Sequence, residues 1–258
     1  MVSDSIHPLR GRTILVTRPA HQASVLAQLI EQAGGKIVLF PAIAIEPPLD
    51  PQGAALLLHE IASYDFVIFT SANAVEQAFI LAPGLATGLR KAFAIGMATA
   101  QALRSHGVKE AIVPEDGADS EAVLRMPELE DVRDRHGLIV RGEGGRGLLA
   151  QTLEQRGAQL RQAECYRRAR PSGDPSGLLV QWRSGGIDGV VAMSAETLNN
   201  LWDMIGEPGH ELLLATPLFV PHPRIAEAAT RLGMADVAIT DSGDEGLVRG
   251  LSAWFALR

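Results

Sequence analysis

Residues 14–48 read ILVTRPAHQASVLAQLIEQAGGKIVLFPAIAIEPP, a stretch that contains a complete strand–helix–strand unit. A short apolar run comes first, and the next segment has apolar residues at helical spacing and stops at two glycines. A second apolar run then leads into an extended segment that closes in proline. Strands that are apolar throughout and alternate with amphipathic helices are typical of a parallel sheet covered on both faces.

The same unit returns later in the chain, at residues 138–171, as LIVRGEGGRGLLAQTLEQRGAQLRQAECYRRARP. Two further strand–helix pairs repeat in the same order, with 65–79 matching 189–202 and 93–103 matching 218–229. The simpler explanation is that any α/β protein repeats its strand–helix unit. The matched order of three different loops favours two similar lobes of parallel sheet over one continuous sheet. The last helix is expected to begin with a capping box, Ser242 with Glu245.

Composition and charge limit the class of protein. The 258 residues suffice for one large domain or two ordinary ones, and the net charge of −7 argues against a general nucleic-acid binder. The single cysteine excludes an internal disulfide and suits a reducing compartment. The N-terminal stretch lacks the pattern of a secretory signal, and no apolar stretch is long enough to span a bilayer. We therefore expect a cytoplasmic protein without a membrane segment.

The loops that follow the strands indicate the chemistry. In a parallel sheet these loops meet at the edge where the carboxyl ends lie, and ligands bind there. They are small, hydroxylic or arginine-bearing, and each opens a helix whose free N–H groups and dipole favour an anion. The seven histidines have no paired spacing, so no metal site is expected. The loops suit carboxylates or phosphates, and the sequence has no Walker loop or nucleophile elbow.

One glycine-rich loop suggests an alternative function. Gly142, Gly144 and Gly147 have the spacing of a dinucleotide-binding turn, and Glu164 stands near the place of a ribose-binding acid. An NAD-dependent oxidoreductase would use such a turn. However, the matching loop of the first repeat has no glycine, and Arg146 lies inside the turn. A second alternative is a bilobal protein that binds or senses small anions, which the repeat alone would equally allow.

Taken in order, the motifs resemble those of the uroporphyrinogen-III synthase family, and the resemblance extends over nearly the whole chain. The order and spacing of the motifs carry it, since each is short. The motifs are ILVTRP (14–19), FTSANAV (69–75), IGMATAQAL (95–103), VRGEGGRGLLAQTLEQRGA (140–158) leading to CYRR (165–168), and SAETLNNLW (194–202) followed by PRIAEAA (223–229).

The resemblance implies a fold of two flavodoxin-like α/β lobes joined by a two-stranded β-ladder. Lobe one would be discontinuous, made of residues 1–40 and 168–258, and lobe two would be the inserted residues 41–167. The chain would cross between them near 40–48 and 163–171, so RQAECYRRARP (161–171) would form the return crossing, with the substrate within reach of its side chains.

The resemblance also implies the reaction. Family members cyclise hydroxymethylbilane, a linear tetrapyrrole with eight carboxylates, to uroporphyrinogen III with loss of water and inversion of ring D through a spiro intermediate. This implies a lyase of haem, sirohaem and cobalamin biosynthesis that uses no cofactor. The expected partner is the small-molecule substrate, with no nucleic acid or membrane, and the protein is expected to be a monomer.

The site residues are those that match family positions. Tyr166 would hydrogen-bond or protonate the departing hydroxyl, and the alternative is a strand tyrosine that merely packs. The arginines of the set would anchor carboxylates or form ion pairs, and its polar residues would bind substrate or cap helices. The candidates for substrate binding are Arg18, Ser71, Asn73, Thr99, Arg141, Ser194 and Arg224.

Further expectations concern the surroundings of these candidates. Arg224 stands near a usual family threonine, and His222 beside it has no assigned role. Cys165 is expected to pack rather than to act as a nucleophile. Because side chains alternate along a strand, at most one of Arg167 and Arg168 should face the substrate.

Overall fold

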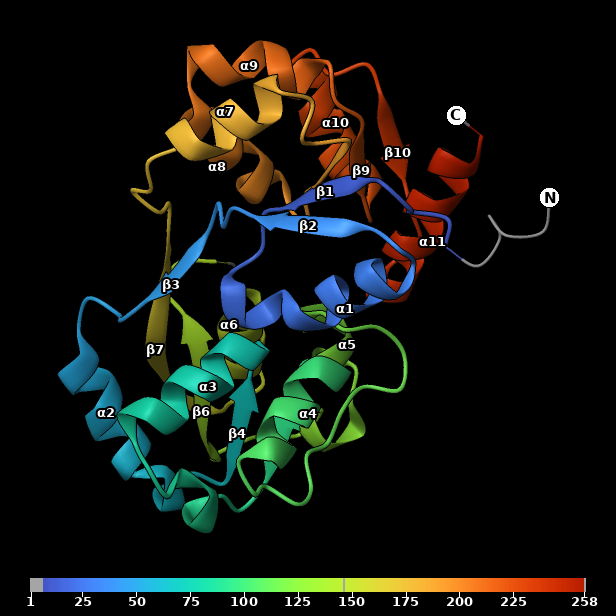
Figure 1. Ribbon diagram of the computed structural model, residues 1–258. Coiled ribbons are helices and arrows are strands. Elements are labelled where there is room, and N and C mark those ends of the chain that lie inside the picture. The colour runs from blue at the N-terminus through green and yellow to red at the C-terminus, as the bar shows by residue number, and fades with distance from the viewer. Residues whose placement is uncertain (1–6, 146, 258) are drawn as a thin grey trace. The chain divides into compact units, whose positions relative to one another are not determined.

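The computed structural model describes residues 7–145 and 147–257, so Arg146 of the glycine-rich loop and residues 1–6 lie outside the described residues. The chain forms two compact units, shown with their elements in Figure 1. Unit 1 consists of the described residues up to Ala44 and from Ala169 onward, and unit 2 is Ile45–Arg168.

Unit 1 is built on a five-stranded sheet in the order β10-β9-β8-β1-β2, and every neighbouring pair is parallel. In chain order within the unit the strands therefore lie 5-4-3-1-2, which is the order of the flavodoxin-like fold. The strands are β1 (Thr13–Val16), β2 (Lys36–Leu39), β8 (Gly189–Val191), β9 (Leu218–Val220) and β10 (Val237–Ile239).

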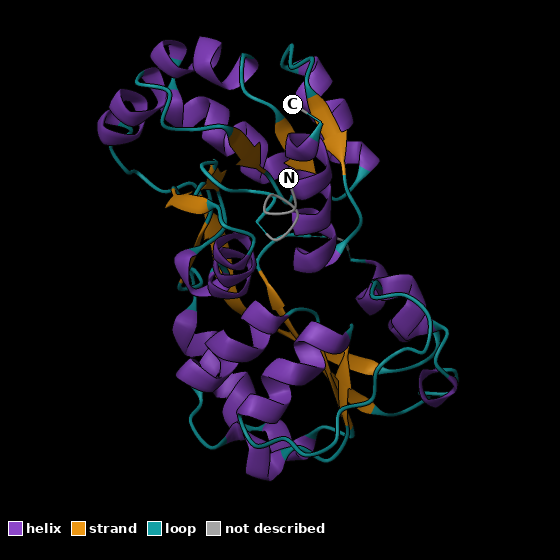
Figure 2. Ribbon diagram, turned by 45° about the vertical axis from the view of Figure 1, so that its right-hand side comes forward, coloured by secondary structure: helices purple, strands orange, loops and turns teal. Residues whose placement is uncertain are grey.

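Helices cover both faces of this sheet (Figure 2). Ile14 and Val16 of β1 pack on the side of α1 and α11, whereas Leu15 packs on the side of α7, α8, α9 and α10. The alternation follows from the period of two along a strand. The helices are α1 (Ser24–Gln32), which follows a 3-10 turn at Ala20–Gln22, α7 (Ser176–Arg183), α8 (Ala195–Ile205), α9 (Glu207–Leu214), α10 (Pro223–Arg231) and α11 (Gly243–Ala256).

Unit 2 has a second five-stranded sheet, in the order β3-β7-β6-β4-β5. The pairs β4–β5, β4–β6 and β6–β7 are parallel, and β3 lies beside β7 at the edge. A single parallel bridge, Phe93 to Ile112, extends the opposite edge. The strands are β3 (Ala44–Glu46), β4 (Phe66–Phe69), β5 (Ala92–Ala94), β6 (His136–Gly142) and β7 (Gln159–Ala169).

This sheet is also covered on both faces. Leu138 and Val140 pack with residues of α2, α3 and α4, whereas Ile139 packs with residues of α5 and α6. Figure 1 shows α3 and α4 next to each other over β4. The helices are α2 (Pro51–His59), α3 (Ala72–Leu81), α4 (Met97–Ser105), α5 (Ser120–Leu124) and α6 (Leu148–Gln155), with 3-10 turns at Ile61–Ser63, Leu85–Gly88 and Pro127–Leu129.

Each sheet combines strands from both sequence repeats. Unit 1 takes β1 and β2 from the first repeat but β8 and β9 from the second, whereas unit 2 takes β6 and β7 from the second and β4 and β5 from the first. The run β2-β1-β8-β9 therefore corresponds to β7-β6-β4-β5. The predicted fold class, two parallel sheets flanked by helices, is confirmed.

Some local predictions were wrong or incomplete. The predicted capping box of α11 is absent, because the side chain of Ser242 makes no capping bond. Gly243 follows it with φ of +82°, so the first residue of the helix departs from the backbone conformation of a regularly capped helix. Helices α2, α5, α7 and α9 were not predicted. Among the described residues, no helix has the length and apolar character needed to cross a membrane.

Candidate functional site

The candidate site of unit 2 lies where the connections of its sheet diverge. From β6 the chain passes through α6 to β7 on one side, and from β4 it passes through α3 to β5 on the other. In open α/β sheets, ligands bind outside the carboxyl ends of the strands at such a switch point. In unit 1 the corresponding neighbours are β1 and β8. The predicted site residues lie within or shortly after these four strands and β5, β7 and β9.

Tyr166 of β7 reaches the unit 2 switch point. Its hydroxyl oxygen lies 3.1 Å from Oγ of Ser71, the residue that opens α3 after β4, and either oxygen can donate. The residue is 2% exposed, and it lines a pocket of about 350 Å³ at the carboxyl edge of the sheet. The lining of this pocket, named here the Tyr166 pocket, includes Thr70, Ser120, Arg141, Gly142, Tyr166 and Arg168.

Ser71 and Ser194 have the same structural role in the two units. Ser71 is the N-cap of α3 and accepts a hydrogen bond from the N–H of Ala74 at 3.0 Å. Ser194 is the N-cap of α8 and accepts from the N–H of Thr197, also at 3.0 Å. The capping alternative therefore holds for both serines. Ser71 differs because its hydroxyl also lies within hydrogen-bonding distance of the Tyr166 hydroxyl.

Arg141 organises the glycine-rich loop that it precedes. Its Nε donates to the carbonyl of Gly142 at 3.1 Å, and another nitrogen donates to the carbonyl of Gly144. A third donates to Oε1 of Gln162 on β7 at 2.9 Å. Three of the five guanidinium donors thus bond to described residues, and the Arg141 side chain also lines the Tyr166 pocket.

The other predicted anchors have varied surroundings. Arg18 forms an ion pair with Asp244 at 2.5 Å, as in the alternative considered for it. Thr99 is only 3% exposed within α4, so its hydroxyl is covered. Asn73 is half-buried in the first turn of α3. Arg224 is exposed near the start of α10.

His222, which had no predicted role, is the N-cap of α10. Its Nδ1 accepts a hydrogen bond from the backbone N–H of Arg224 at 3.1 Å. A histidine thus caps α10 in this chain. The side chain of Arg224 remains available at the edge that also holds Arg18 and Ser194, after β9, β1 and β8.

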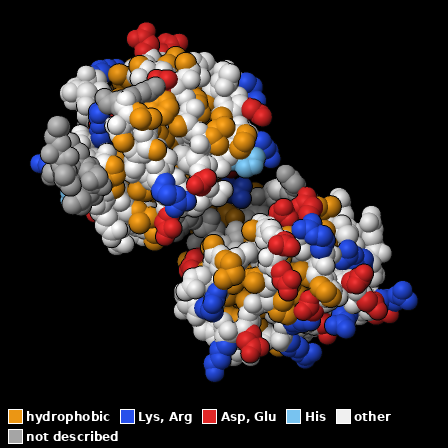
Figure 3. All heavy atoms as spheres, turned by 90° about the vertical axis from the view of Figure 1, so that its right-hand side faces the viewer, with side chains coloured by type: hydrophobic (Ala, Val, Ile, Leu, Met, Phe, Trp, Pro, Cys, Tyr) orange, Lys and Arg blue, Asp and Glu red, His pale blue; other side chains and the backbone are white. Residues whose placement is uncertain are grey.

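The arginines between residues 141 and 170 do not all face one site. Arg156 donates to the backbone carbonyls of Leu124 and Leu129 at 2.9 and 2.8 Å, and Arg167 pairs with Glu46. Arg168 lines the Tyr166 pocket. The alternation of side chains along a strand predicted that Arg167 and Arg168 would not both face the site. The face of unit 2 in Figure 3 likewise shows acidic and basic side chains interspersed.

Cys165 is a packing residue, as expected. It is fully buried, and burial raises the pKa of its thiol to about 12. A thiol with so high a pKa carries almost no thiolate at neutral pH, so it is a poor nucleophile.

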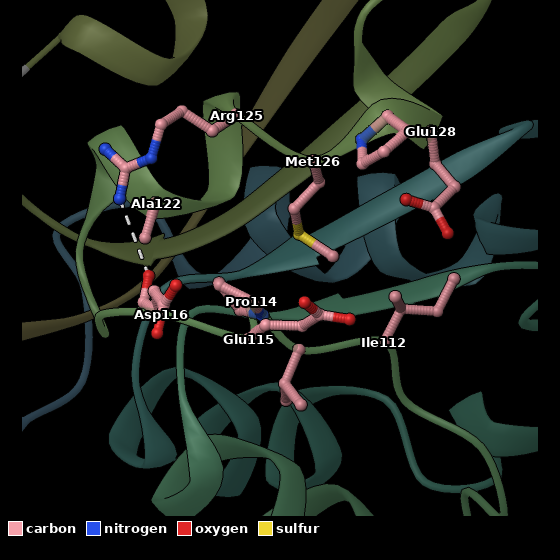
Figure 4. Close-up of a pocket in the computed structure, with 10 residues that line it drawn as sticks. Ile112, Pro114, Glu115, Asp116, Ala122, Arg125, Met126 and Glu128 are labelled. Atoms are coloured by element: carbon pink, nitrogen blue, oxygen red, sulfur yellow. Dashed lines mark hydrogen bonds between the residues drawn. The ribbon is translucent and has the colours of Figure 1, made fainter.

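A second pocket of unit 2, about 400 Å³ in volume, has no predicted site residue in its lining (Figure 4). In Figure 4 the guanidinium of Arg125 points to the backbone carbonyl of Asp116, at 3.5 Å, and Met126 points into the space between them and Ile112. No group of histidine, cysteine and acidic side chains suited to a metal occurs among residues 7–145 and 147–257.

Among the pocket residues that sequence analysis did not predict as site residues are Thr70 and Gly142. Thr70 directly follows β4 and precedes Ser71, and its hydroxyl donates to the carbonyl of Val140 at 3.3 Å. Gly142 was considered only as part of a dinucleotide turn, yet it lies against the Tyr166 ring. A glycine at the end of a buried strand was the one available signal, since it indicates close approach of another group.

The fold and the site define a class: a two-unit α/β protein whose parallel sheets present hydroxyl, arginine and tyrosine side chains at their carboxyl edges. The family model described as "Uroporphyrinogen-III synthase HemD" matches residues 24–248. The chain belongs to this family, the cyclising enzymes of lyase type in tetrapyrrole biosynthesis.

Individual relatives agree with this membership. The uroporphyrinogen-III synthase of Escherichia coli K12 is 32% identical over 244 residues, covering 93% of this chain and 99% of that protein. That of Salmonella typhimurium LT2 is 33% identical over 246 residues, with the same two coverages. The crystal structure of uroporphyrinogen-III synthetase from Helicobacter pylori is 16% identical with a TM-score of 0.59, and the match covers 96% of this chain and 100% of that one. At that identity the structure supports the fold alone.

Proposed function

We propose that this chain cyclises hydroxymethylbilane to uroporphyrinogen III, and that Tyr166 acts on the departing hydroxyl group. The observation that carries the assignment of Tyr166 is its hydroxyl, 3.1 Å from Oγ of Ser71, in the lining of a pocket at the switch point of the unit 2 sheet. A phenol held by a second hydroxyl has a defined direction in which to donate.

The reaction begins when the carbon–oxygen bond of the terminal hydroxymethyl group breaks. The pyrrole nitrogen supplies electrons to the carbon, giving an azafulvene cation, and the hydroxyl leaves as water with a proton from Tyr166. The substituted α-carbon of ring D attacks the cation and forms the spiro intermediate. Fragmentation and reclosure then invert ring D, and the proton lost when the last pyrrole regains aromaticity restores the phenol. One water is released, so the atoms balance.

The main task of the protein is to control geometry. Without it, the open α-carbon of ring D attacks and the type I isomer forms. Holding the substituted carbon in attack range is an orientation effect, and a difference of about 3–4 kcal/mol between the two barriers gives a few hundred to one. Such control needs many anchors rather than one strong catalytic group.

The proposed anchors belong to the carboxyl edges of both sheets. In unit 2 they are Arg141, Ser71 at the N-cap of α3 and Asn73 in the first turn of that helix. In unit 1 they are Ser194 and Arg224, together with Arg18, which would exchange Asp244 for a substrate carboxylate. Thr99 would contribute only if α4 moved, because its side chain is buried. With a net charge of −7, this local positive charge must overcome long-range repulsion of the substrate.

The test is to give the purified protein hydroxymethylbilane and to resolve the isomers after oxidation. The expected product is predominantly type III, formed faster than in a blank without protein. Predominantly type I product at the rate of the blank would end the proposal.

The remaining expectations are separate proposals. The protein acts as a monomer in the cytoplasm, without a cofactor and without nucleic acid. Size-exclusion chromatography with light scattering checks the monomer. Titration with nicotinamide dinucleotides, followed by tryptophan fluorescence, checks for the cofactor that the glycine-rich loop had suggested, and no saturable change is expected.

A further inference from the structure

The register between β6 and β7 changes where the two strands approach the site. Partners run one to one from His136 opposite Gln159 to Arg141 opposite Glu164, and then Gly142 stands opposite Tyr166. Cys165 is therefore the extra residue of a β-bulge. A bulge adds one residue to a strand and redirects the side chains beyond it.

The bulge accounts for two consecutive residues of β7 packing in the same core. In a regular strand Cys165 and Tyr166 would point to opposite faces. Here both are buried, at 0% and 2% exposure, and both belong to the core on the α2, α3 and α4 side of the sheet. The bulge thus turns the tyrosine toward α3, whose first residue follows Ser71.

Gly142 provides the space in which the turned ring lies. A Cβ atom at this position would stand 2.6 Å from Cζ, 2.8 Å from Cε2 and 2.9 Å from Cε1 of Tyr166. These distances are well inside van der Waals contact, so the ring lies directly on the glycine. The φ of Gly142 is not in the left-handed region. Its lack of a side chain, rather than its backbone freedom, is what this position requires.

The backbone around the glycine holds the same arrangement. The N–H of Glu143 donates to the carbonyl of Tyr166 at 2.7 Å, directly after the bulge. With the backbone held on one side and the ring against Gly142 on the other, the phenol oxygen is directed to Ser71. Cζ, the atom nearest to the missing Cβ, is the carbon that bears this oxygen.

We infer that Gly142 is a positioning residue for the reaction: with the bulge at Cys165, it sets the place of the Tyr166 hydroxyl. This rests on the proposed function for the part that concerns catalysis. The placement of the ring is a property of unit 2 and can be measured without it.

The first variant to measure is Gly142→Ala. The ring must shift away from the added methyl group, and the hydroxyl shifts with it. We expect kcat to fall by about 10- to 100-fold with little change in KM, because displacement of a reacting group by an ångström has effects of this size. The share of type I isomer should rise. A folded variant with the kcat and isomer ratio of the parent protein would overturn the inference.

Gly137→Ala is the matched control on the same strand. A Cβ there would lie 2.4 Å from Cζ and 2.6 Å from Cε2 of Phe66, a comparable clash with an aromatic ring. It should reduce stability without changing the isomer ratio. If it changes kcat and the isomer ratio as much as Gly142→Ala does, the effect is general and the inference fails.

A pair of double variants separates position from stability. In the Tyr166→Phe background, Gly142→Ala should lower kcat no further, although it should still destabilise the protein because phenylalanine keeps the ring. In the Tyr166→Ala background the destabilisation should disappear, and a Gly142→Ala chain that fails to fold should fold again. A further loss of kcat in the first background, or no relief in the second, would overturn the inference.

These outcomes are distinct from failure of the proposed function. If Tyr166→Phe alone keeps full kcat and product, the hydroxyl has no role in the reaction, and that part of the proposed function fails. The relief of destabilisation in the Tyr166→Ala background would still show that Gly142 places the ring. If Tyr166→Phe keeps full kcat and this relief is also absent, then both the role of the hydroxyl and the inference about Gly142 are refuted.

Discussion

The strands β2 and β7 occupy corresponding places in the two sheets, yet they differ in length and in what they carry. β2 starts at Lys36 opposite Thr13 and ends after four residues at Leu39. β7 starts at Gln159 opposite His136 and runs for eleven residues to Ala169. Counted from these starts, Pro41 falls where β7 has Glu164. Proline has no N–H for a ladder bond, so it ends the first strand where the second continues.

The difference shows how a repeated fold can acquire the proposed proton donor in one unit only. Both units place a serine at the N-cap of a helix beside the switch point. Only in unit 2 does the longer strand bring a phenol to that serine, since the counterpart of Tyr166 by the same count is Ile43. The sheets supply a common frame, and the additional length of β7 supplies the proposed chemistry.

The largest expected effect comes from removing the phenol oxygen. Tyr166→Phe should lower kcat by about 10²- to 10⁴-fold, the usual contribution of a positioned proton donor, with the ring and the fold retained. Ile43→Leu, at the corresponding place in unit 1, should leave kcat unchanged. Steady-state assays with isomer analysis measure both. Full activity of Tyr166→Phe would remove the leaving-group role and with it the functional contrast between the strands.

The next effect tests whether the two cores are equivalent. Phe93 and Phe219 are the central residues of the corresponding strands β5 and β9, and both are fully buried. Phe93 meets Phe66 edge-on at 6.3 Å between centroids, and Phe219 meets Trp254 edge-on at 5.7 Å. Replacing either with alanine should cost about 3–5 kcal/mol, because each leaves a cavity of similar chemistry.

Natural probes allow the two losses to be followed separately in urea. All three tryptophans, Trp182, Trp202 and Trp254, belong to unit 1, and the one cysteine belongs to unit 2. Phe219→Ala should shift the fluorescence transition, and Phe93→Ala should shift the onset of thiol labelling. If each variant moves both transitions equally, the units unfold together and the cores are not independent.

The features that the sequence predicted correctly are those with a local physical cause. The short apolar run of β1 and the helical spacing of α1 define those elements because burial sets the period. The pairing of β1 with β8 has no local signal, because it joins segments far apart in the sequence. Just after β1, for example, Thr17 Oγ1 donates to the carbonyl of Val191, which is 174 residues away. Only the family resemblance implied that the chain leaves one sheet and returns to it.

The features that were missed depend on tertiary contacts. The bulge at Cys165 is a shift in the register between β6 and β7, which falls between Arg141 and Gly142. No pattern in CYRR indicates it. The capping box of α11 failed because Gly243 adopts a left-handed φ that residue spacing does not reveal. Tyr166 was singled out because it matches a family position on the extended segment, but its bond to Ser71 required the folded sheet.

The third effect concerns alkaline pH and unit 2 alone. Burial raises the pKa of the Cys165 thiol to about 12, so the folded unit keeps a proton that the unfolded chain loses near pH 8.5. The stability from this group is fully present below pH 8.5 and declines as the pH rises toward about 12. At pH 10 the loss should be about 2 kcal/mol.

Urea unfolding between pH 8 and pH 10.5 measures this loss, with far-UV circular dichroism as the signal. Cys165→Ala should show a smaller decline. Part of the decline should remain in that variant, because the pKa of Tyr64 is also raised. Burial and the charge of Glu60 raise this pKa, and the charge of Arg161 offsets part of the increase. Tryptophan fluorescence, which reports unit 1, should change less over the same range. An equal decline with and without Cys165 would contradict the assignment.

The smallest effect compares the two capping serines directly. Ser71→Ala and Ser194→Ala each remove an N-cap, which should cost about 1 kcal/mol in either unit. Only Ser71→Ala also removes the partner of the Tyr166 hydroxyl. Its kcat should therefore fall several-fold more than that of Ser194→Ala, while a Ser71→Thr variant, which keeps a hydroxyl and a cap, should recover much of the rate. If the two alanine variants lose equal rate, the bond to Tyr166 contributes nothing to turnover, and the serines would differ only in the neighbour they happen to meet.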